Sequence, residues 1–286
     1  MSSSPSSERQ ARRVARYYRW LDGLSFFQER RAEGEAAHPI HRALTDPEGG
    51  PPSPLVLHRL MREGLELPPS PRVLDAGCGY GATMLDLAPA LGGDWTGLTL
   101  SEAQRARGGA AIAAAGLAER VRILIQSYDT PPPGPFDLII GIESLIHSAD
   151  PAATIAALAP VLAPGGHLAM VDDMPEEALP PEAARRFDIF RRYWRCPVAP
   201  TRAGWVRAME AAGLALVAER DFSPLLRVRS MAQAAPRLRE LDAWPARLRR
   251  ALGLGVRAEA EIGGIMLETL QTEGFVRYRL LVAKKV

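Results

Sequence analysis

The sequence is poor in cysteine, in lysine and in long apolar runs. Cys78 and Cys196 are its two cysteines; they cannot form a disulfide framework and lack the spacing of a zinc site, so we assign no metal ligands and expect a reducing compartment. No apolar run reaches the ~18 residues of a membrane-spanning helix, and the polar, serine-rich start does not resemble a signal peptide. These absences predict a soluble, cytoplasmic protein without stable membrane insertion.

An excess of positive charge is also missing. Lysine occurs only as Lys284 and Lys285, and 35 basic residues face 33 acidic ones. Few cations are therefore left to neutralise a phosphate backbone, which disfavours nucleic-acid binding.

The 286 residues, 47% of them hydrophobic, suffice for one substantial core. From residue 72 onward, short β-rich runs alternate with helical segments, as in a doubly wound parallel sheet. We expect an N-terminal helical cap (1–54), a sheet core (55–174), a helical lid insertion (175–200) and a return to the sheet with further helices (201–286). The predicted strands cover 73–75, 95–98, 121–125, 136–140, 167–171, 214–222 and 276–283, and the predicted helices cover 9–31, 55–64, 83–91, 102–115, 152–162, 201–212, 231–252 and 259–273.

A glycine-rich loop, 75–81, joins the first core strand to the next helix with the sequence Asp-Ala-Gly-Cys-Gly-Tyr-Gly. Glycines let the backbone turn sharply and approach a ligand closely, and the helix N-terminus offers free N–H groups. Asp75, at the strand tip, would repel a pyrophosphate and suits a cationic, amino-bearing ligand instead.

With this loop in this context, the sequence resembles the class I S-adenosylmethionine-dependent methyltransferases from about residue 73 to residue 173. The resemblance implies an α/β fold with a seven-stranded, Rossmann-like sheet whose last strand alone is antiparallel. It also implies S-adenosyl-L-methionine as the cofactor, with Asp75, Ala76, Gly77 and Gly79 around its methionine part.

The segment after the second strand, 97–104, reads Gly-Leu-Thr-Leu-Ser-Glu-Ala-Gln and lacks the ribose-binding acid that most of the superfamily carries. It is similar to the cyclopropane fatty acid synthases and the isoprenoid C-methyltransferases that act on prenyl diphosphates. That match implies that Thr99 and Gln104 bind the ribose beside Leu100; the alternative is a helix cap at Ser101 followed by a solvated glutamine. Residues expected to cover the adenine follow the third strand: Gln126, Ser127 and Tyr128.

Glu143 and His147 follow the fourth strand and are the catalytic candidates. They are four residues apart, so a helical segment would place both on one face. In prenyl diphosphate C-methyltransferases, an aligned glutamate would stabilise and then deprotonate the carbocation left when an alkene takes up the methyl group. In sugar O-methyltransferases, a histidine at the position of His147 would act as the base beside an acid, here Asp173.

The Thr-Leu-Ser-x-x-Gln string and the closing segment 273–283 favour carbon chemistry. We therefore expect methyl transfer to a small molecule, foremost to a carbon of an isoprenoid or lipid-like alkene. The alternatives are O-methylation of a natural-product sugar or phenol, and a cofactor-binding protein without catalysis. Mg²⁺ would accompany a diphosphate substrate, and homo-oligomer formation stays open.

A carbocation must be shielded from water, and the sheet alone supplies no roof. We therefore expect one or more aromatic residues of each helical addition to face Glu143, and an arginine of the insertion to meet an anionic head group; the alternative is an aromatic core remote from the cofactor. Two histidines of the N-terminal region, His38 and His41, are expected to be capping or surface residues, and no metal ligand is assigned to them or to His58. The aromatic residues expected to face Glu143 are drawn from Tyr17, Tyr18, Trp20 and Phe27 of the cap and Phe187, Phe190, Tyr193 and Trp194 of the insertion. The arginine expected to meet the head group is drawn from Arg185, Arg186, Arg191, Arg192 and Arg195.

Overall fold

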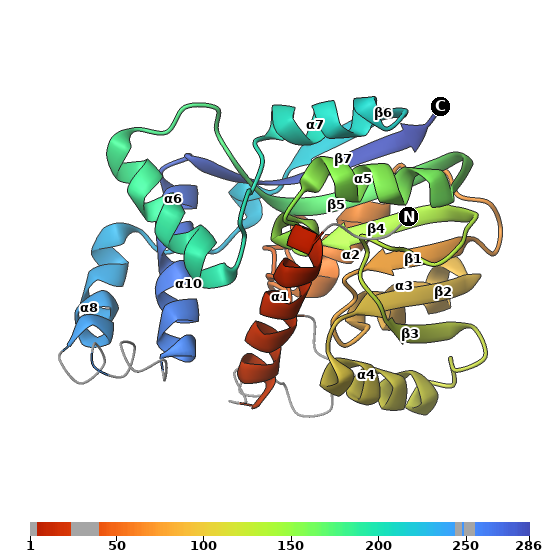
Figure 1. Cartoon of the computed structure of the whole chain (residues 1–286), viewed down its shortest axis with the longest axis horizontal. Helices are drawn as coiled ribbons and strands as arrows, with labels where there is room; N and C mark the ends of the chain where they lie inside the picture. Colours follow the sequence, from red (N-terminus) through yellow and green to blue (C-terminus); the bar gives the residue numbers. More distant parts are fainter. Residues whose placement is uncertain (1–4, 24–39, 244–247, 249–254) are drawn as a thin grey trace.

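The computed structural model describes residues 5–23, 40–243, 248 and 255–286. They include one seven-stranded sheet with the order β3-β2-β1-β4-β5-β7-β6 (Figure 1). β7 is antiparallel to β5 and β6, and the other neighbours are parallel, as predicted. The strands are β1 (Arg72–Ala76), β2 (Asp94–Thr99), β3 (Val121–Ile125), β4 (Phe136–Ile142), β5 (Leu162–Pro175), β6 (Leu214–Asp221) and β7 (Val276–Lys285).

Helices cover both faces of the sheet, so its central strands are buried almost throughout and read as apolar runs. Leu57, Met84 and Ile112 pack on one face together with Val73. Ile155 and Trp205 pack on the other face. The helices of the first face are α2 (Pro54–Arg62), α3 (Ala82–Leu91) and α4 (Glu102–Ala114), and those of the second are α5 (Pro151–Leu158) and α7 (Arg202–Ala211).

A third apolar cluster joins three helices beside the sheet, α6 (Pro181–Trp194), α8 (Met231–Asp242) and α10 (Val256–Thr272). Phe190 of α6 and Ile265 of α10 are both fully buried there. α8 ends at Asp242, and most of the remaining predicted helix up to 252 lies outside the described residues. The lid insertion is thus not isolated, because the C-terminal helices support it.

The N-terminal helix α1 (Pro5–Gly23) begins four residues earlier than predicted. It crosses the carboxyl edge of the sheet and lies beside α10 (Figure 1). The rest of the predicted cap up to residue 39, including Phe27 and His38, lies outside the described residues.

β5 differs most from its prediction. The predicted helix ends at 162 and the predicted strand begins at 167, but α5 ends at Leu158 and the strand already begins at Leu162. Pairing with β4 passes from Leu162 directly to His167, so that 163–166 forms an irregularity within the strand. Gly165, with φ +73°, supplies the left-handed conformation that this requires.

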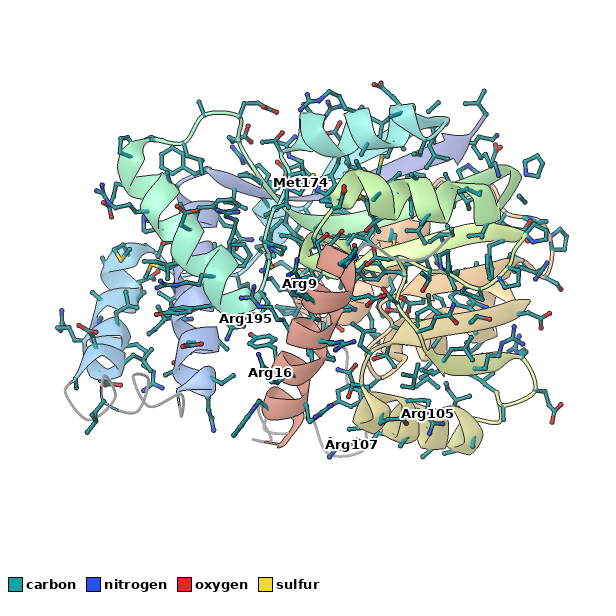
Figure 2. The ribbon with its side chains drawn as sticks, viewed as in Figure 1. Arg9, Arg16, Arg105, Arg107, Met174 and Arg195 are labelled. Atoms are coloured by element: carbon teal, nitrogen blue, oxygen red, sulfur yellow. The ribbon has the colours of Figure 1, made fainter. Side chains whose placement is uncertain are left out.

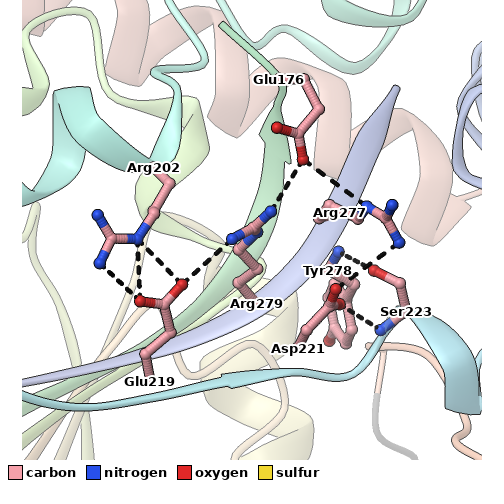
Figure 3. A network of polar contacts seen from close by, with 8 residues as sticks. All are labelled: Glu176, Arg202, Glu219, Asp221, Ser223, Arg277, Tyr278 and Arg279. Atoms are coloured by element: carbon pink, nitrogen blue, oxygen red, sulfur yellow. Dashed lines mark hydrogen bonds and ion pairs between the residues drawn. The ribbon is translucent and has the colours of Figure 1, made fainter. Parts of the chain in front are cut away.

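Polar contacts fix β7 between its neighbours (Figure 3). Arg279 bonds Glu176 at 2.8 Å and Glu219 at 3.2 Å, and the backbone N–H of Tyr278 donates to Ser223 Oγ at 2.8 Å. Exposed ion pairs contribute little stability singly. Here the contacts matter because they fix the position of Tyr278, which is fully buried and whose hydroxyl reaches Glu143 directly after β4.

Candidate active site

A cavity of about 950 Å³ lies at the carboxyl ends of β1, β2, β4 and β5. In open α/β sheets this edge is where ligands bind. Tyr18 of α1, Trp194 of α6 and Ala260 of α10 line the same cavity as the glycine loop. Both helical additions therefore contribute to the wall of the site, and the part that they form is called its roof below.

Asp75 sits at the strand tip and lines this cavity. Its side chain is buried, and its Oδ2 has no hydrogen-bond partner among the described residues. Burial without a cation raises the pKa of the carboxyl to about 7. Such an unsatisfied acid suits the ammonium group of S-adenosylmethionine, so the residues present fit the predicted cofactor.

The glycine loop needs glycine for two reasons. Gly77 and Gly79 have φ of +108° and +54°, which L side chains rarely adopt. A Cβ on Gly77 would also lie 2.5 Å from Ser144 Cβ. The close packing of this loop against the segment after β4 is what brings Asp75 and the catalytic candidates into one cavity.

The ribose candidates form a buried pair. Thr99 Oγ1 donates to Gln104 Oε1 at 2.6 Å, and both residues line the cavity. Ser101 does cap α4, accepting from the Gln104 N–H at 3.3 Å, but Gln104 is buried rather than solvated. Ser101 thus caps α4 while Thr99 and Gln104 line the cavity, so the two alternatives do not exclude each other.

Gln126 Nε2 donates to the Thr130 carbonyl. The side-chain oxygen of Gln126 is then the atom that can accept a hydrogen bond from the exocyclic amine of adenine. Tyr128 donates to the Ser144 carbonyl at 3.2 Å. Leu100, Gln126, Ser127 and Tyr128 all line the cavity. Ala76 alone of the predicted cofactor residues does not line it; its carbonyl accepts from Ser144 Oγ at 2.6 Å, a supporting contact.

Glu143 directly follows β4 in a left-handed conformation, with φ +48°. Such strain in a non-glycine residue persists where its surroundings over-determine it, as at functional sites. Glu143 Oε1 accepts from the Tyr278 hydroxyl at 2.8 Å and from the Arg42 N–H at 3.1 Å. Burial raises the pKa of this carboxyl, although Arg42 opposes the shift.

Asp173 does not pair with His147, contrary to the expectation for an O-methyltransferase. Arg42 donates to its two oxygens at 2.9 and 2.8 Å, and Gln271 donates to one of them at 2.6 Å. Arg42 could not be predicted from the sequence, because it comes from a loop that is 131 residues away from Asp173 in the chain.

His147 lines the cavity but has other partners. Its Nε2 lies 3.1 Å from the Tyr18 hydroxyl, and its Nδ1 lies 3.4 Å from the Arg195 carbonyl. Burial lowers the pKa of the imidazole to about 4. The helical segment that would place His147 on one face with Glu143 does not form, because the short 3₁₀ turn Leu145–His147 begins only after Glu143.

Asp172 is a site residue that the sequence analysis missed. It lines the cavity, Oδ2 accepts from the Ile146 N–H at 3.2 Å, and Oδ1 is buried without a partner among the described residues. Burial raises the pKa of this carboxyl well above its usual value. Alternation along β5 predicts that Asp172 and Asp173 point to opposite faces of the sheet, yet both line the cavity at this end of the strand.

The aromatic expectations hold in part. Tyr17 and Tyr18 of α1 and Phe190 and Trp194 of α6 line the same cavity as Glu143. Trp20 is largely exposed. Phe187 and Tyr193 do not line the cavity.

The arginine expectation is wrong for the insertion, since none of its five arginines lines the cavity. Arg195, at the end of α6 and facing α1 (Figure 2), bonds Glu259 at 3.2 Å and stacks over Tyr17. The others pair with acids or stack on their own helix. Arginines of other segments line the cavity instead: Arg42, Arg227, Arg229, Arg237 and Arg257.

The expectation of a capping or surface position does not hold for His41, which is half-buried. His58 is fully buried and bonds both Asp86 and His41, and His41 lines the cavity. The carboxylate partner lies 28 residues away in sequence, so local spacing could not reveal it.

Across the described residues, no group of three or more histidine, cysteine, aspartate or glutamate side chains is arranged to hold a metal ion. Within the same part of the chain, every helix is too short or too polar to span a membrane.

Comparisons with known proteins identify the family. The model of a family described as "Methyltransferase domain" matches residues 27–219. The chain is 28% identical over 231 residues to a probable chloroplastic tocopherol O-methyltransferase of Oryza sativa subsp. japonica, which covers 74% of this chain and 60% of that protein. It is 30% identical over 189 residues to the tocopherol O-methyltransferase of Arabidopsis thaliana, covering 63% and 50%. The chain thus spans about half to three-fifths of the length of these curated relatives.

Solved structures show the same fold. The [4+2]-cyclase SpnF superposes with a TM-score of 0.73 at 23% identity, covering 96% of each chain. The geranyl diphosphate C-methyltransferase of Streptomyces coelicolor A3(2), solved with Mg²⁺, geranyl diphosphate and S-adenosyl-L-homocysteine, gives a TM-score of 0.68 at 18% identity over 99% of each chain. The predicted fold, enzyme class and cofactor are confirmed: this chain belongs to the methyltransferase domain family, and its domain is S-adenosylmethionine-dependent.

Proposed function

We propose that this protein methylates a carbon of a small isoprenoid or other lipid-like alkene. The observation that carries the proposal is the half-buried carboxylate of Glu143, held at the cavity wall by Tyr278 and by the Arg42 backbone. S-adenosylmethionine supplies an electrophilic methyl group when bound. A carboxylate fixed at this edge stabilises the positive charge that an alkene acquires on methylation.

The cavity roof supports the same chemistry. Tyr18, Phe190 and Trp194 place aromatic rings around the cavity, and aromatic faces attract cations. They also exclude the water that would quench a carbocation. The part of the cavity beside Asp75 binds the cofactor, and the part beneath these aromatic rings receives the apolar chain of the substrate.

O-methylation is the second candidate, favoured by the names of the two tocopherol relatives and by His147 within the cavity. Against it, a pKa of about 4 makes His147 a weak base. A rate that depended on ionisation of this histidine would fall near pH 4, rather than near the ordinary value of ~6.5.

Two variants separate the candidates. Glu143→Gln should lower turnover roughly a hundredfold or more with unchanged cofactor affinity, because the amide keeps the shape and loses the charge. His147→Ala should cost much less, through lost packing against Tyr18. The measurement is steady-state kinetics on prenyl diphosphates, sterols and phenols, with calorimetry of cofactor binding. A larger loss of turnover in His147→Ala than in Glu143→Gln would overturn the proposal of carbon methylation.

A further inference from the structure

The outer face of α1 carries positive charge without acidic partners. Figure 2 shows Arg9 and Arg16 two turns apart along this helix. Within the described part of the chain, none of the arginines of α1 bonds a carboxylate. Helical arginines elsewhere do so within one turn, as Arg105 does with Glu102. The arginines of α1 are all exposed, and they are Arg9, Arg12, Arg13, Arg16 and Arg19.

This arrangement of charge disfavours the helix on its own. The five arginines follow one another at spacings of three and four residues, and like charges at these spacings repel each other on a helix surface. The sequence of α1 holds two acids, Glu8 and Asp22, against the five arginines. An anionic surface laid against this face would replace the repulsion by attraction.

Trp20 lies on the same face. It follows Arg9, Arg13 and Arg16 along the helix, at successive spacings of four, three and four residues. Its side chain is 48% exposed. A helix face that only meets water gains nothing from a bulky aromatic ring, whereas tryptophan beside basic residues is typical of helices that lie at a membrane interface.

The inner face of α1 belongs to the cavity. Gln10, Val14, Tyr17 and Tyr18 line it, and none of the five arginines does. The helix is therefore amphipathic between the cavity and the outside. Because a helix with its side chains is about 10 Å thick, whatever binds the arginines lies close to the cavity roof.

We propose that α1 docks the protein on the anionic surface of a lipid bilayer. The contact is peripheral: the arginines meet lipid phosphates, and Trp20 enters the interface as a single aromatic anchor. The benefit of docking rests on the proposed function, since a lipid-like alkene dissolves in the bilayer and the docked cavity lies one helix away from it. Nucleic acid fits less well, because the protein has little excess positive charge beyond this face.

Co-sedimentation of the full chain with vesicles measures docking without any substrate. The protein should bind vesicles of equal parts phosphatidylcholine and phosphatidylglycerol, and should not bind vesicles of phosphatidylcholine alone. Binding should fall steeply with salt, because the screening length shortens from ~10 Å at 0.1 M to ~3 Å at 1 M. Trp20→Gln should weaken binding severalfold at each salt concentration, since it removes the interfacial anchor and keeps the charge.

The arginines are tested by a triple variant that combines Arg9→Gln, Arg13→Gln and Arg16→Gln. It should bind the anionic vesicles roughly a hundredfold more weakly, because each arginine near such a surface contributes about fivefold. Glutamine preserves the helix, since its helix propensity is close to that of arginine. The affinity for S-adenosylmethionine should stay unchanged, because the three arginines lie outside the cavity; calorimetry thereby also checks the fold.

A matched control removes the same charge from other elements. Arg62 of α2, Arg122 of β3 and Arg207 of α7 are exposed and do not line the cavity. Replacing all three with glutamine should leave vesicle binding within about twofold, because salt screens charges away from the docked surface. Equal losses in both triple variants, or wild-type protein that ignores the anionic vesicles, would overturn the proposal.

An acidic protein is the alternative occupant of this face, and poly-L-glutamate is its probe. At equal concentrations of negative charge, the wild type should bind the polymer more weakly than the anionic vesicles, because the polymer offers no interface for Trp20. Tighter binding to the polymer would assign α1 to a protein partner and would rule out the lipid surface.

The vesicle measurements do not depend on the reaction, so they stand even if carbon methylation fails. If it is confirmed, the triple variant of α1 should methylate a substrate dissolved in anionic vesicles roughly tenfold or more slowly than the wild type. The same substrate in neutral detergent micelles should react at the wild-type rate. Equal rates of both proteins on the vesicles would contradict a role of docking in substrate delivery.

Discussion

At the residue scale, the cofactor-binding role proposed for Asp75 is opposed to its contribution to stability. Its pKa of about 7 lies above the value of an unfolded chain, so its contribution favours the folded state at low pH and turns unfavourable as pH rises to about 7. In the ligand-free protein, Asp75→Asn should therefore raise the free energy of unfolding above pH 7, by on the order of 2–4 kcal/mol. The gain should shrink as pH falls toward ~4.

Urea unfolding at pH 8 and pH 5 measures this gain, and calorimetry should show that the same variant binds S-adenosylmethionine far more weakly. In the wild type, affinity should decline below pH 7, because a neutral carboxyl no longer attracts the ammonium group. A variant that is less stable at pH 8, or that binds as tightly, would be inconsistent with the role given to Asp75.

Gly77 gives a second prediction. Gly77→Val should abolish binding of both S-adenosylmethionine and its demethylated product, because valine resists a φ of +108° and its Cβ would displace Ser144. Gly109→Ala is the matched control: it lies within α4 with open space around its Cβ, and alanine favours a helix. Calorimetry of both variants decides; undiminished binding by Gly77→Val refutes the loop assignment.

The residue scale also shows where sequence reasoning stopped. Asp75, Gly77 and Glu143 could be predicted, because each stands at the tip of a strand whose apolar pattern is visible. Arg42 and the pair His41–His58 could not, because their partners lie far along the chain and only the packing of α2 and its preceding loop brings them together.

At the element scale, α1 covers part of the cavity and is bonded directly to the segment that carries the catalytic candidates. Gln10 donates to the carbonyls of His147 and Arg195, at 2.9 and 2.7 Å, and so joins α1 to the turn after β4 and to the end of α6. The helix is amphipathic and its apolar positions were predictable. The irregular start of β5 was not, since a Pro-Gly-Gly stretch ordinarily indicates a turn between elements.

Deleting the residues before Arg31 should therefore cost activity far more than cofactor affinity, because Tyr17 and Tyr18 line the roof side while Asp75 and the glycine loop remain. Gln10→Ala is a milder variant that removes only the two bonds to the carbonyls. Turnover and calorimetric affinity should be compared for both. Full turnover by the truncated protein would show that α1 is dispensable.

At the scale of the whole molecule, the alternation of strands and helices predicted the sheet, its order of elements and the site edge. This alternation could not predict how the N-terminal helix and the helical insertion cover the cavity. α6 was predicted from its own residues, but its support by α8 and α10, and the replacement of its arginines at the cavity by Arg42 and others, depend on the final packing.

Carbon methylation is tested most directly by following the methyl group itself. The protein should be incubated with S-adenosylmethionine labelled with ¹³C in the methyl group and with prenyl diphosphates, sterols and phenols, with and without Mg²⁺, and the products examined by mass spectrometry and ¹³C NMR. We predict a labelled methyl carbon bonded to carbon in an isoprenoid or other lipid-like alkene. A labelled methyl bonded to oxygen, on a phenol or another hydroxyl, would contradict the account.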